Sequence, residues 1–227
     1  ARNYSFRNPS AQLYELGRTY FKRPDGLADE PKVLSLGAYG EGYDFFTLKG
    51  AVETVLDGLR IPAARYVADR ENPSYHPGRC AKVYVGDKCL GTLGQVHPHV
   101  AANYGMDCEL YAAELDFAAL LSVMGPDPVY QPLPRFPAVS RDIAVVCDKA
   151  IPVGDLEECI RRGAKGLLKA VELFDIYTGI GVPEGKKSVA FRLTLRADDR
   201  SLTAEEADAD VKSILAALES ELGARLR

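Results

Sequence analysis

Hydrophobic and polar residues alternate along three segments near the C-terminal end of the chain. Ile143 and Val145 alternate in the first segment, Phe174 and Ile176 in the second, and the apolar residues of 189–195 in the third. A period of two residues is typical of strands that bury one face. These three segments are therefore predicted to be half-buried strands.

Two helices are predicted between and after these strands. The first covers 153–164 and follows Pro152, a residue type favoured at the start of a helix. The second begins at Ala204, because Thr203 and Glu206 have the spacing of a capping box. Spacings of three and four residues give this second helix one apolar face. That face consists of Ala207, Val211, Ile214, Leu215, Leu218 and Leu222.

A short final strand over 225–227 would complete a ferredoxin-like βαββαβ unit, whose two helices cover one face of the sheet and leave the other open. Alternation predicts which side chains occupy each face. Phe191, Leu193 and Leu195 are expected under the helices, as are Phe174 and Ile176. The side chains expected on the open face include Ala144, Asp175, Tyr177, Ser188 and Arg192.

The chemistry of this expected open face suits the bases of single-stranded RNA. Tyr177 offers a ring for stacking, Asp175 a carboxylate that accepts hydrogen bonds from base amino or imino groups, Ser188 a hydroxyl, and Ala144 little bulk. From residue 135 onward the chain has 15 Lys and Arg against 16 Asp and Glu. Attraction of phosphate must therefore be local. The candidates near the end of the first helix and in the turn before the third strand are Arg161, Arg162, Lys165, Lys169, Lys186 and Lys187.

The first half of the chain combines strand-like and helical patterns. An apolar run begins at residue 11, and a helix that ends near Leu59 is expected to be capped by Thr47. Residues 81–85 and 89–93 alternate around Gly86 and Asp87, which predicts a hairpin.

The sequence of this half does not favour a zinc site or a phosphate-binding loop. Its histidines and cysteines have no spacing typical of a zinc site, and its glycines lack the lysine of a phosphate loop. The residues concerned are His76, Cys80, His97, His99, Gly37, Gly40 and Gly42.

A proline-rich stretch over 126–137 predicts a semi-rigid connector with a domain boundary near Pro134. The expected domains are 1–134 and 135–227. The 227 residues, 47% of them hydrophobic, suffice for a core in each domain, and the net charge of −4 indicates only solubility. Five cysteines without a disulfide framework favour a reducing compartment, and no apolar run predicts a membrane span.

The segments FPAVSRDIA, LFDIYTG, GKKSVAFRL and SLTAEE resemble the ferredoxin-fold anticodon-binding domain of phenylalanine–tRNA synthetases. The resemblance implies that the open face holds the anticodon of phenylalanine tRNA. Ala144, Asp175, Tyr177 and Ser188 match the positions that would carry this contact. Arg141 and Arg192 are their less certain neighbours.

The segments LYELGRTYF, DFFTLKGAVE, YHPGRCA, GTLGQVHPHV and ELYAAELDF resemble the synthetase-like domain of the bacterial β subunit of the same enzyme. The resemblance implies an α+β chain, with a class II synthetase-like antiparallel sheet domain before the ferredoxin-like domain. It implies a carboxy-terminal piece of a cytoplasmic α₂β₂ enzyme that uses ATP and magnesium. It implies no membrane or DNA contact.

The same resemblance assigns catalysis to the α subunit. No F-R-x-E pattern is present in this chain, so a triphosphate would lack the paired arginines of class II sites. The chain is therefore expected to be non-catalytic and to hold no cofactor or metal itself. Two alternatives are an independent adenylating enzyme and a protein-interaction module without an RNA role.

Overall fold

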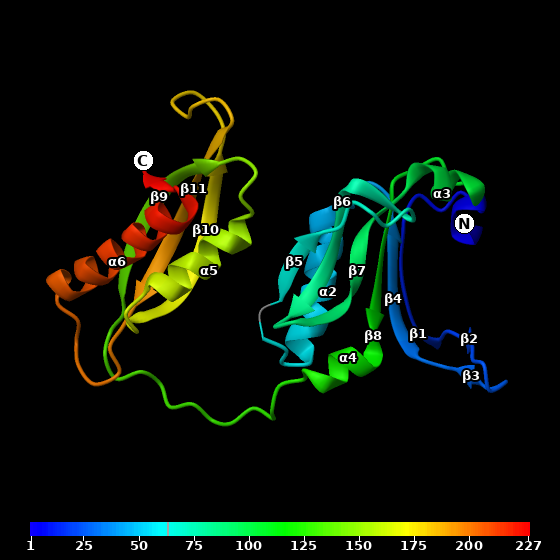
Figure 1. Ribbon diagram of the computed structural model, residues 1–227, viewed down its shortest axis with the longest axis horizontal. Coiled ribbons are helices and arrows are strands. Elements are labelled where there is room, and N and C mark those ends of the chain that lie inside the picture. The colour runs from blue at the N-terminus through cyan, green and yellow to red at the C-terminus, as the bar shows by residue number, and fades with distance from the viewer. Residues whose placement is uncertain (63) are drawn as a thin grey trace. The chain divides into compact units, whose positions relative to one another are not determined.

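The computed structural model describes residues 1–62 and 64–227, which form two compact units, Ala1–Pro128 and Val129–Arg227 (Figure 1). Residues 124–134 contain no helix or strand. The division between the units and the predicted boundary near Pro134 both lie in this segment.

The N-terminal unit is built on a six-stranded sheet in which every pairing is antiparallel, in the order β1-β4-β8-β7-β6-β5. Its strands are β1 (Ala11–Arg18), β4 (Lys32–Tyr39), β5 (Arg65–Ala68), β6 (Tyr75–Val85), β7 (Lys88–Val96) and β8 (Leu110–Asp116). β2 (Phe21–Lys22) and β3 (Ala28–Asp29) form a small separate ribbon. The helices are α1 (Arg2–Ser5), α2 (Phe45–Gly58), α3 (Pro98–Asn103) and α4 (Phe117–Ser122).

The core of this unit lies between α2 and the sheet. α2 buries Leu48, Val52 and Leu56 and packs against β7 and β8. The predicted end of this helix is confirmed within one residue, but its predicted cap is wrong. Asp44 is the N-cap, and its carboxylate accepts a 2.7 Å hydrogen bond from the Thr47 backbone N–H. The predicted hairpin is confirmed as β6 and β7, with longer strands than expected.

The C-terminal unit has the predicted order of elements. They are β9 (Val139–Asp148), α5 (Val153–Gly163), β10 (Leu168–Tyr177), β11 (Lys186–Leu195), α6 (Ala204–Leu222) and β12 (Arg225–Leu226). The strands form one antiparallel sheet in the order β10-β11-β9-β12. α5 and α6 lie side by side over one face of this sheet (Figure 1). The ferredoxin-like arrangement is confirmed.

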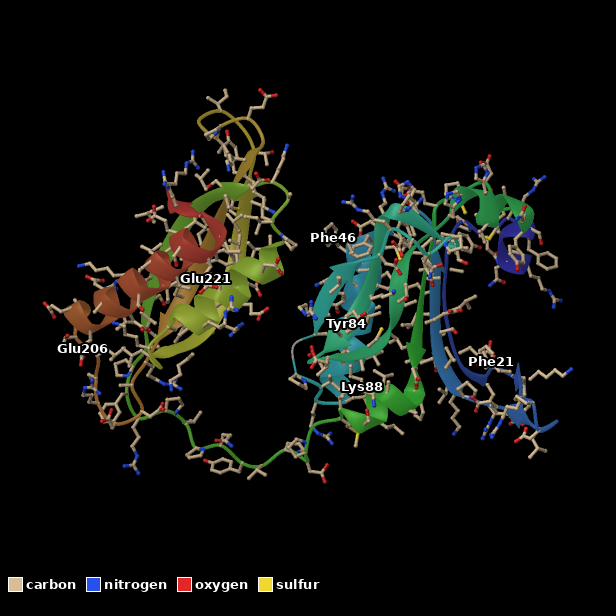
Figure 2. The ribbon with its side chains drawn as sticks, viewed as in Figure 1. Phe21, Phe46, Tyr84, Lys88, Glu206 and Glu221 are labelled. Carbon is tan, nitrogen blue, oxygen red and sulfur yellow. The ribbon has the colours of Figure 1, made fainter. Side chains whose placement is uncertain are left out.

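Local hydrogen bonds fix the start of α6, and a hydrogen bond from α5 contacts its last turn. The Glu206 backbone N–H donates to the Thr203 hydroxyl at 3.3 Å, and the Thr203 N–H donates to the Glu206 carboxylate at 3.0 Å, which confirms the predicted capping box. Figure 2 shows Glu206 at the start of this helix and Glu221 near its end. Glu221 accepts a 2.7 Å hydrogen bond from Arg162 of α5, which links the two helices.

Buried residues confirm the predicted apolar face of α6. Ala207, Ile214 and Leu218 are buried, and Ile214 and Leu218 belong to the same core cluster as Val145 and Phe191 of the sheet. Within residues 1–62 and 64–227, no helix is both long enough and apolar enough to cross a membrane.

Candidate nucleic-acid interface

Four side chains predicted on the open face lie together on the sheet face that α5 and α6 leave uncovered. In the register of the sheet, Ala144 pairs with Ala190 and Ala190 with Asp175. In the next row, Ser188 pairs with Tyr177. Residues directly opposite in antiparallel strands share a face. Ala144, Asp175, Tyr177 and Ser188, here called the platform, therefore occupy two adjacent rows of one face.

The ring of Tyr177 is held near the end of β10 by the turn that follows it. Its hydroxyl donates a 3.4 Å hydrogen bond to the Ile180 carbonyl. The ring also lies against Gly179, where an added Cβ would stand 2.2 Å from the Tyr177 hydroxyl oxygen. The side chain at residue 179 must therefore be absent for the ring to take this position. The ring remains 38% exposed.

A guanidinium group already lies over the Tyr177 ring. Arg227 follows β12, and its backbone N–H donates a 2.9 Å hydrogen bond to the Ala144 carbonyl. Its guanidinium carbon is 5.5 Å from the centroid of the Tyr177 ring on β10. Because β9 and β11 separate β12 from β10, the Arg227 side chain crosses the platform. Ser188 is only 4% exposed beneath it.

The Asp175 side chain is exposed in the row that also contains Ala190 and Ala144. Among the described residues, its carboxylate takes part in no hydrogen bond or ion pair. A carboxylate can accept several hydrogen bonds, and free nucleobases supply N–H donors on their pairing edges. The geometry of the platform therefore combines an aromatic ring, a free acceptor and a floor of small side chains.

Arg192 is fixed on the same face by Asp142 of β9. Its Nε donates to one carboxylate oxygen at 2.9 Å and its Nη2 to the other at 3.0 Å. The hydrogen bond from Arg192 lowers the pKa of Asp142, and the carboxylate raises the pKa of Arg192. Such a two-point pair holds the guanidinium plane in one orientation.

Phe174 is not buried under the helices, so this part of the predicted alternation is wrong. A β-bulge between Leu173 and Asp175 inserts Phe174 as an extra residue in β10. Its ring is 50% exposed and lies 5.5 Å from the Arg192 guanidinium on the open face. Ile176 pairs with buried Val189 and so faces the helices, but it is largely exposed as well.

Arg141 lies apart from the other predicted site residues. It pairs with Leu193 across β9 and β11, so it shares the face that the helices cover. Its Nε donates a 2.9 Å hydrogen bond to Asp208 of α6. The alternation of β9 places Arg141 and Asp142 on opposite faces. Arg141 therefore has no contact with the platform.

Three of the lysines expected to attract phosphate are engaged within the chain. Lys169 donates to Asp198 at 2.8 Å, and Lys187 donates to the Ile151 carbonyl. Lys186 lies 3.7 Å from an Asp148 oxygen. Positive charge near the platform comes instead from Arg192 and Arg227.

A family model described as the phenylalanyl tRNA synthetase beta chain CLM domain matches residues 1–117 of this chain. The chain belongs to this family. A second model, described as the ferredoxin-fold anticodon binding domain, matches residues 134–227. That second match spans the sheet that carries the platform. The predicted fold class, α+β with a ferredoxin-like second domain, is confirmed.

Named relatives agree with this membership. The phenylalanine–tRNA ligase beta subunit of Clostridium tetani is 41% identical over the whole chain, which covers 29% of that relative. The corresponding protein of Clostridium acetobutylicum is 39% identical with the same coverage, and that of Symbiobacterium thermophilum is 43% identical over 95% of the chain and 25% of the relative. The chain thus spans less than a third of the length of these relatives.

A solved pyrrolysyl-tRNA synthetase from Desulfitobacterium hafniense aligns with 51% of this chain and 42% of its own, at 17% identity and a TM-score of 0.42. That likeness is too weak to support a conclusion about either unit.

A cavity in the N-terminal unit of this chain does not suit ATP. It has a volume of about 360 Å³ and lies between β1, β4 and the start of α2. Asp44 and Thr47 line it together with Tyr43, Tyr111 and mainly apolar groups, and no Lys, Arg or His belongs to the lining. A triphosphate there would face a carboxylate without a compensating cation.

The histidines and cysteines of this unit do not form a metal site among the described residues. The Nδ1 atom of His76 accepts a hydrogen bond from the Gly78 N–H, and that of His97 accepts one from the His99 N–H. Burial raises the pKa of the Cys80 thiol to about 11, which disfavours the thiolate that a metal requires.

Alternation alone did not identify Phe174, Gly179 and Arg227. The bulge at Phe174 leaves no mark in a regular hydrophobic pattern. The contact of Arg227 depends on pairing across the sheet. Gly179 carries a sequence signal, because a glycine two residues after an exposed tyrosine permits the ring to fold against the turn.

Proposed function

We propose that the C-terminal unit binds the anticodon region of phenylalanine tRNA through the platform of Ala144, Asp175, Tyr177 and Ser188. The observation that carries this proposal is the position of the four side chains in two adjacent rows of a helix-free sheet face. The match to an anticodon-binding domain model over residues 134–227 supports it.

Each platform residue has a distinct role in this proposal. The Tyr177 ring stacks on one base, and the Asp175 carboxylate accepts hydrogen bonds from the amino or imino groups of that base. The Ser188 hydroxyl contacts the base edge, while Ala144 permits close approach. In the free chain Arg227 lies on Tyr177 at 5.5 Å, so the ring already accepts a planar group. The incoming base replaces this guanidinium.

We further propose that the N-terminal unit packs against a catalytic α subunit in an α₂β₂ phenylalanine–tRNA ligase. The relatives are named as beta subunits, which supports the presence of a partner subunit. β1 is an edge strand that exposes Tyr14 and Leu16 on one face of the sheet and Leu13 on the other, apolar side chains suited to protein contact. ATP and magnesium then act in the α subunit. The five free cysteines fit a cytoplasmic protein.

Titration of fluorescent phenylalanine tRNA against the full chain in low salt tests the RNA role. Tyr177→Ala is expected to weaken binding by about 1–3 kcal/mol, the range for loss of one base stack. Tyr104→Ala is the matched control, because Tyr104 is exposed in the N-terminal unit. Equal affinity of the wild-type chain and Tyr177→Ala would remove Tyr177 from the site.

Co-purification with the α subunit tests the docking role separately. Tyr14→Glu places a charge on the face of β1 that exposes Tyr14 and Leu16, and it is expected to reduce recovery of the complex without affecting tRNA binding by the chain. Undiminished recovery would place the α subunit elsewhere on the chain. The alternative is a protein-interaction module without an RNA role. It predicts that the wild-type chain recovers the α subunit but binds cognate and non-cognate anticodons equally.

A further inference from the structure

Phe174 is a large apolar side chain on a sheet face that has no helix above it. Leu173 pairs with Phe191 and Asp175 with Ala190, so Phe174 is the inserted residue of the bulge. Half of its surface is exposed, although Leu168 and Val171 of the same strand pack against the core. Bulges commonly redirect one side chain near functional sites. Here the redirected side chain is an aromatic ring.

The Phe174 ring is held in place by a guanidinium that is itself fixed. Arg192 is bonded through Nε and Nη2 to the two oxygens of Asp142, and its guanidinium carbon lies 5.5 Å from the Phe174 ring centroid. Asp142 of β9 therefore fixes Arg192 of β11, and Arg192 in turn positions the Phe174 ring. A ring with a fixed position binds a flat partner with little loss of conformational entropy.

Phe174 and Tyr177 stand on the same strand and on the same face. They are three positions apart in the sequence, which corresponds to about 10 Å of extended strand. Asp175 lies between the two rings. Four-stranded sheets that read single-stranded RNA commonly stack two or three bases on aromatic side chains of one open face.

We propose that the Phe174 ring forms a second nucleobase-stacking position on the open face, held by Arg192 and adjacent to the position on Tyr177. This inference rests on the proposed function, because it assigns a second base of the same RNA strand. The first base meets Tyr177 and Asp175, and a neighbouring base meets Phe174. The Nη1 group of Arg192, which Asp142 does not engage, faces the RNA and donates to a phosphate.

The two positions differ in what they recognise. Asp175 offers acceptor atoms to the edge of the first base, so that position discriminates between bases. Phe174 offers only a ring face, and stacking tolerates every base. The second position therefore contributes affinity and orientation without selecting base identity.

The test uses the full chain and a fluorescent anticodon stem-loop of phenylalanine tRNA, in intact form and in a series with one loop base removed at a time. Phe174→Ala is expected to weaken binding of the intact RNA about fivefold to a hundredfold. Phe174→Leu keeps an apolar side chain and is expected to lose as much. Phe174→Tyr keeps the ring and is expected to bind as the wild type does.

The abasic series identifies the base concerned. When the base that stacks on Phe174 is removed, the RNA is expected to bind the wild type and Phe174→Ala equally. When the adjacent base that stacks on Tyr177 is removed, the RNA is expected to bind the wild type and Tyr177→Ala equally. Full affinity of Phe174→Ala together with weak binding by Tyr177→Ala would overturn the second position and leave the platform in place. Full affinity of both variants would overturn the second position together with the RNA function.

Discussion

Two central strands, β9 and β11, and the edge strand β10 belong to the same sheet. Buried and exposed side chains alternate regularly along β9 and β11 but not along β10. On β9 and β11, Val145, Phe191 and Leu193 are fully buried, and Asp142 and Arg192 lie on the opposite face. On β10 the register shifts twice, and Phe174 emerges on the open face. The exposed face thereby gains a second aromatic ring beside Tyr177.

The difference follows from the number of neighbours that hold each strand. β11 pairs with β10 on one side and β9 on the other, so an inserted residue would break two ladders. β10 pairs only with β11, so an inserted residue disrupts one ladder. Bulges are accordingly more frequent at sheet edges. An edge strand can therefore expose aromatic side chains to a ligand, whereas a central strand must bury such side chains.

The largest expected effect is a loss of stability on removal of the Phe191 ring, which should far exceed the loss on removal of the Phe174 ring. Phe191→Ala removes a fully buried side chain of β11 and is expected to lower the free energy of unfolding of the C-terminal unit by about 3–5 kcal/mol. Phe174→Ala is expected to lower it by less than about 1 kcal/mol, because that ring is half exposed. Hydrogen exchange of β11 amides measures both changes in the full chain. Similar losses would show that Phe174 belongs to the core.

The second prediction concerns the turn after the edge strand. Gly179→Ala is expected to displace the Tyr177 ring, because the added Cβ would lie 2.2 Å from the hydroxyl oxygen. Affinity for phenylalanine tRNA should then fall by about 1–3 kcal/mol, as for loss of one stack. Fluorescence titration measures the loss. Gly154→Ala is the control, because no atom lies within 4 Å of its added Cβ.

Unchanged tRNA affinity of Gly179→Ala would mean that the position of the ring set by this turn does not matter for binding.

A smaller effect is expected where β12 reaches across to the edge strand. Arg227→Ala removes the guanidinium that lies on Tyr177 in the free chain. Such a contact at an exposed site contributes about 0.5–1 kcal/mol, so the variant should bind the anticodon stem-loop up to about fivefold more tightly. Anisotropy titration measures the change. Weaker binding by the variant would show instead that Arg227 contacts RNA.

The smallest expected effect concerns the ion pair that orients Arg192 over the edge strand. The hydrogen bond from Arg192 lowers the pKa of Asp142. The pair therefore contributes fully above the ordinary carboxyl pKa, about 3.9, and is lost as the pH falls through the lower folded value. A carbon NMR titration of the Asp142 carboxyl should give a midpoint below that of the Arg192→Ala variant. Equal midpoints would contradict the pairing.

Hydrophobic alternation and capping signals were sufficient to predict most of the C-terminal unit. Thr203 and Glu206 define the start of α6 because their reciprocal bonds depend only on local spacing. The inward residues of β11 were predicted because a strand paired on both sides and covered by helices must alternate. The same alternation brought Asp175 and Ser188 to one face with Tyr177.

The features that the sequence did not predict depend on competition between two possible helix caps or on contacts between residues far apart in the sequence. Asp44 caps α2 in place of Thr47, although both residue types are good caps and lie three residues apart. The buried Asp210 of α6 accepts a 2.6 Å hydrogen bond from the Lys165 backbone N–H, a contact across 45 residues. Pattern alone would exclude a charged group from this apolar interface.

We expect RNA to bind the helix-free face of the C-terminal sheet. Titration of the anticodon stem-loop of phenylalanine tRNA into the ¹⁵N-labelled full chain, followed by amide NMR, tests it directly. The largest shifts are predicted at Ala144, Asp175, Tyr177 and Ser188. Shifts concentrated on α5 and α6, with those four amides unmoved, would contradict the claim.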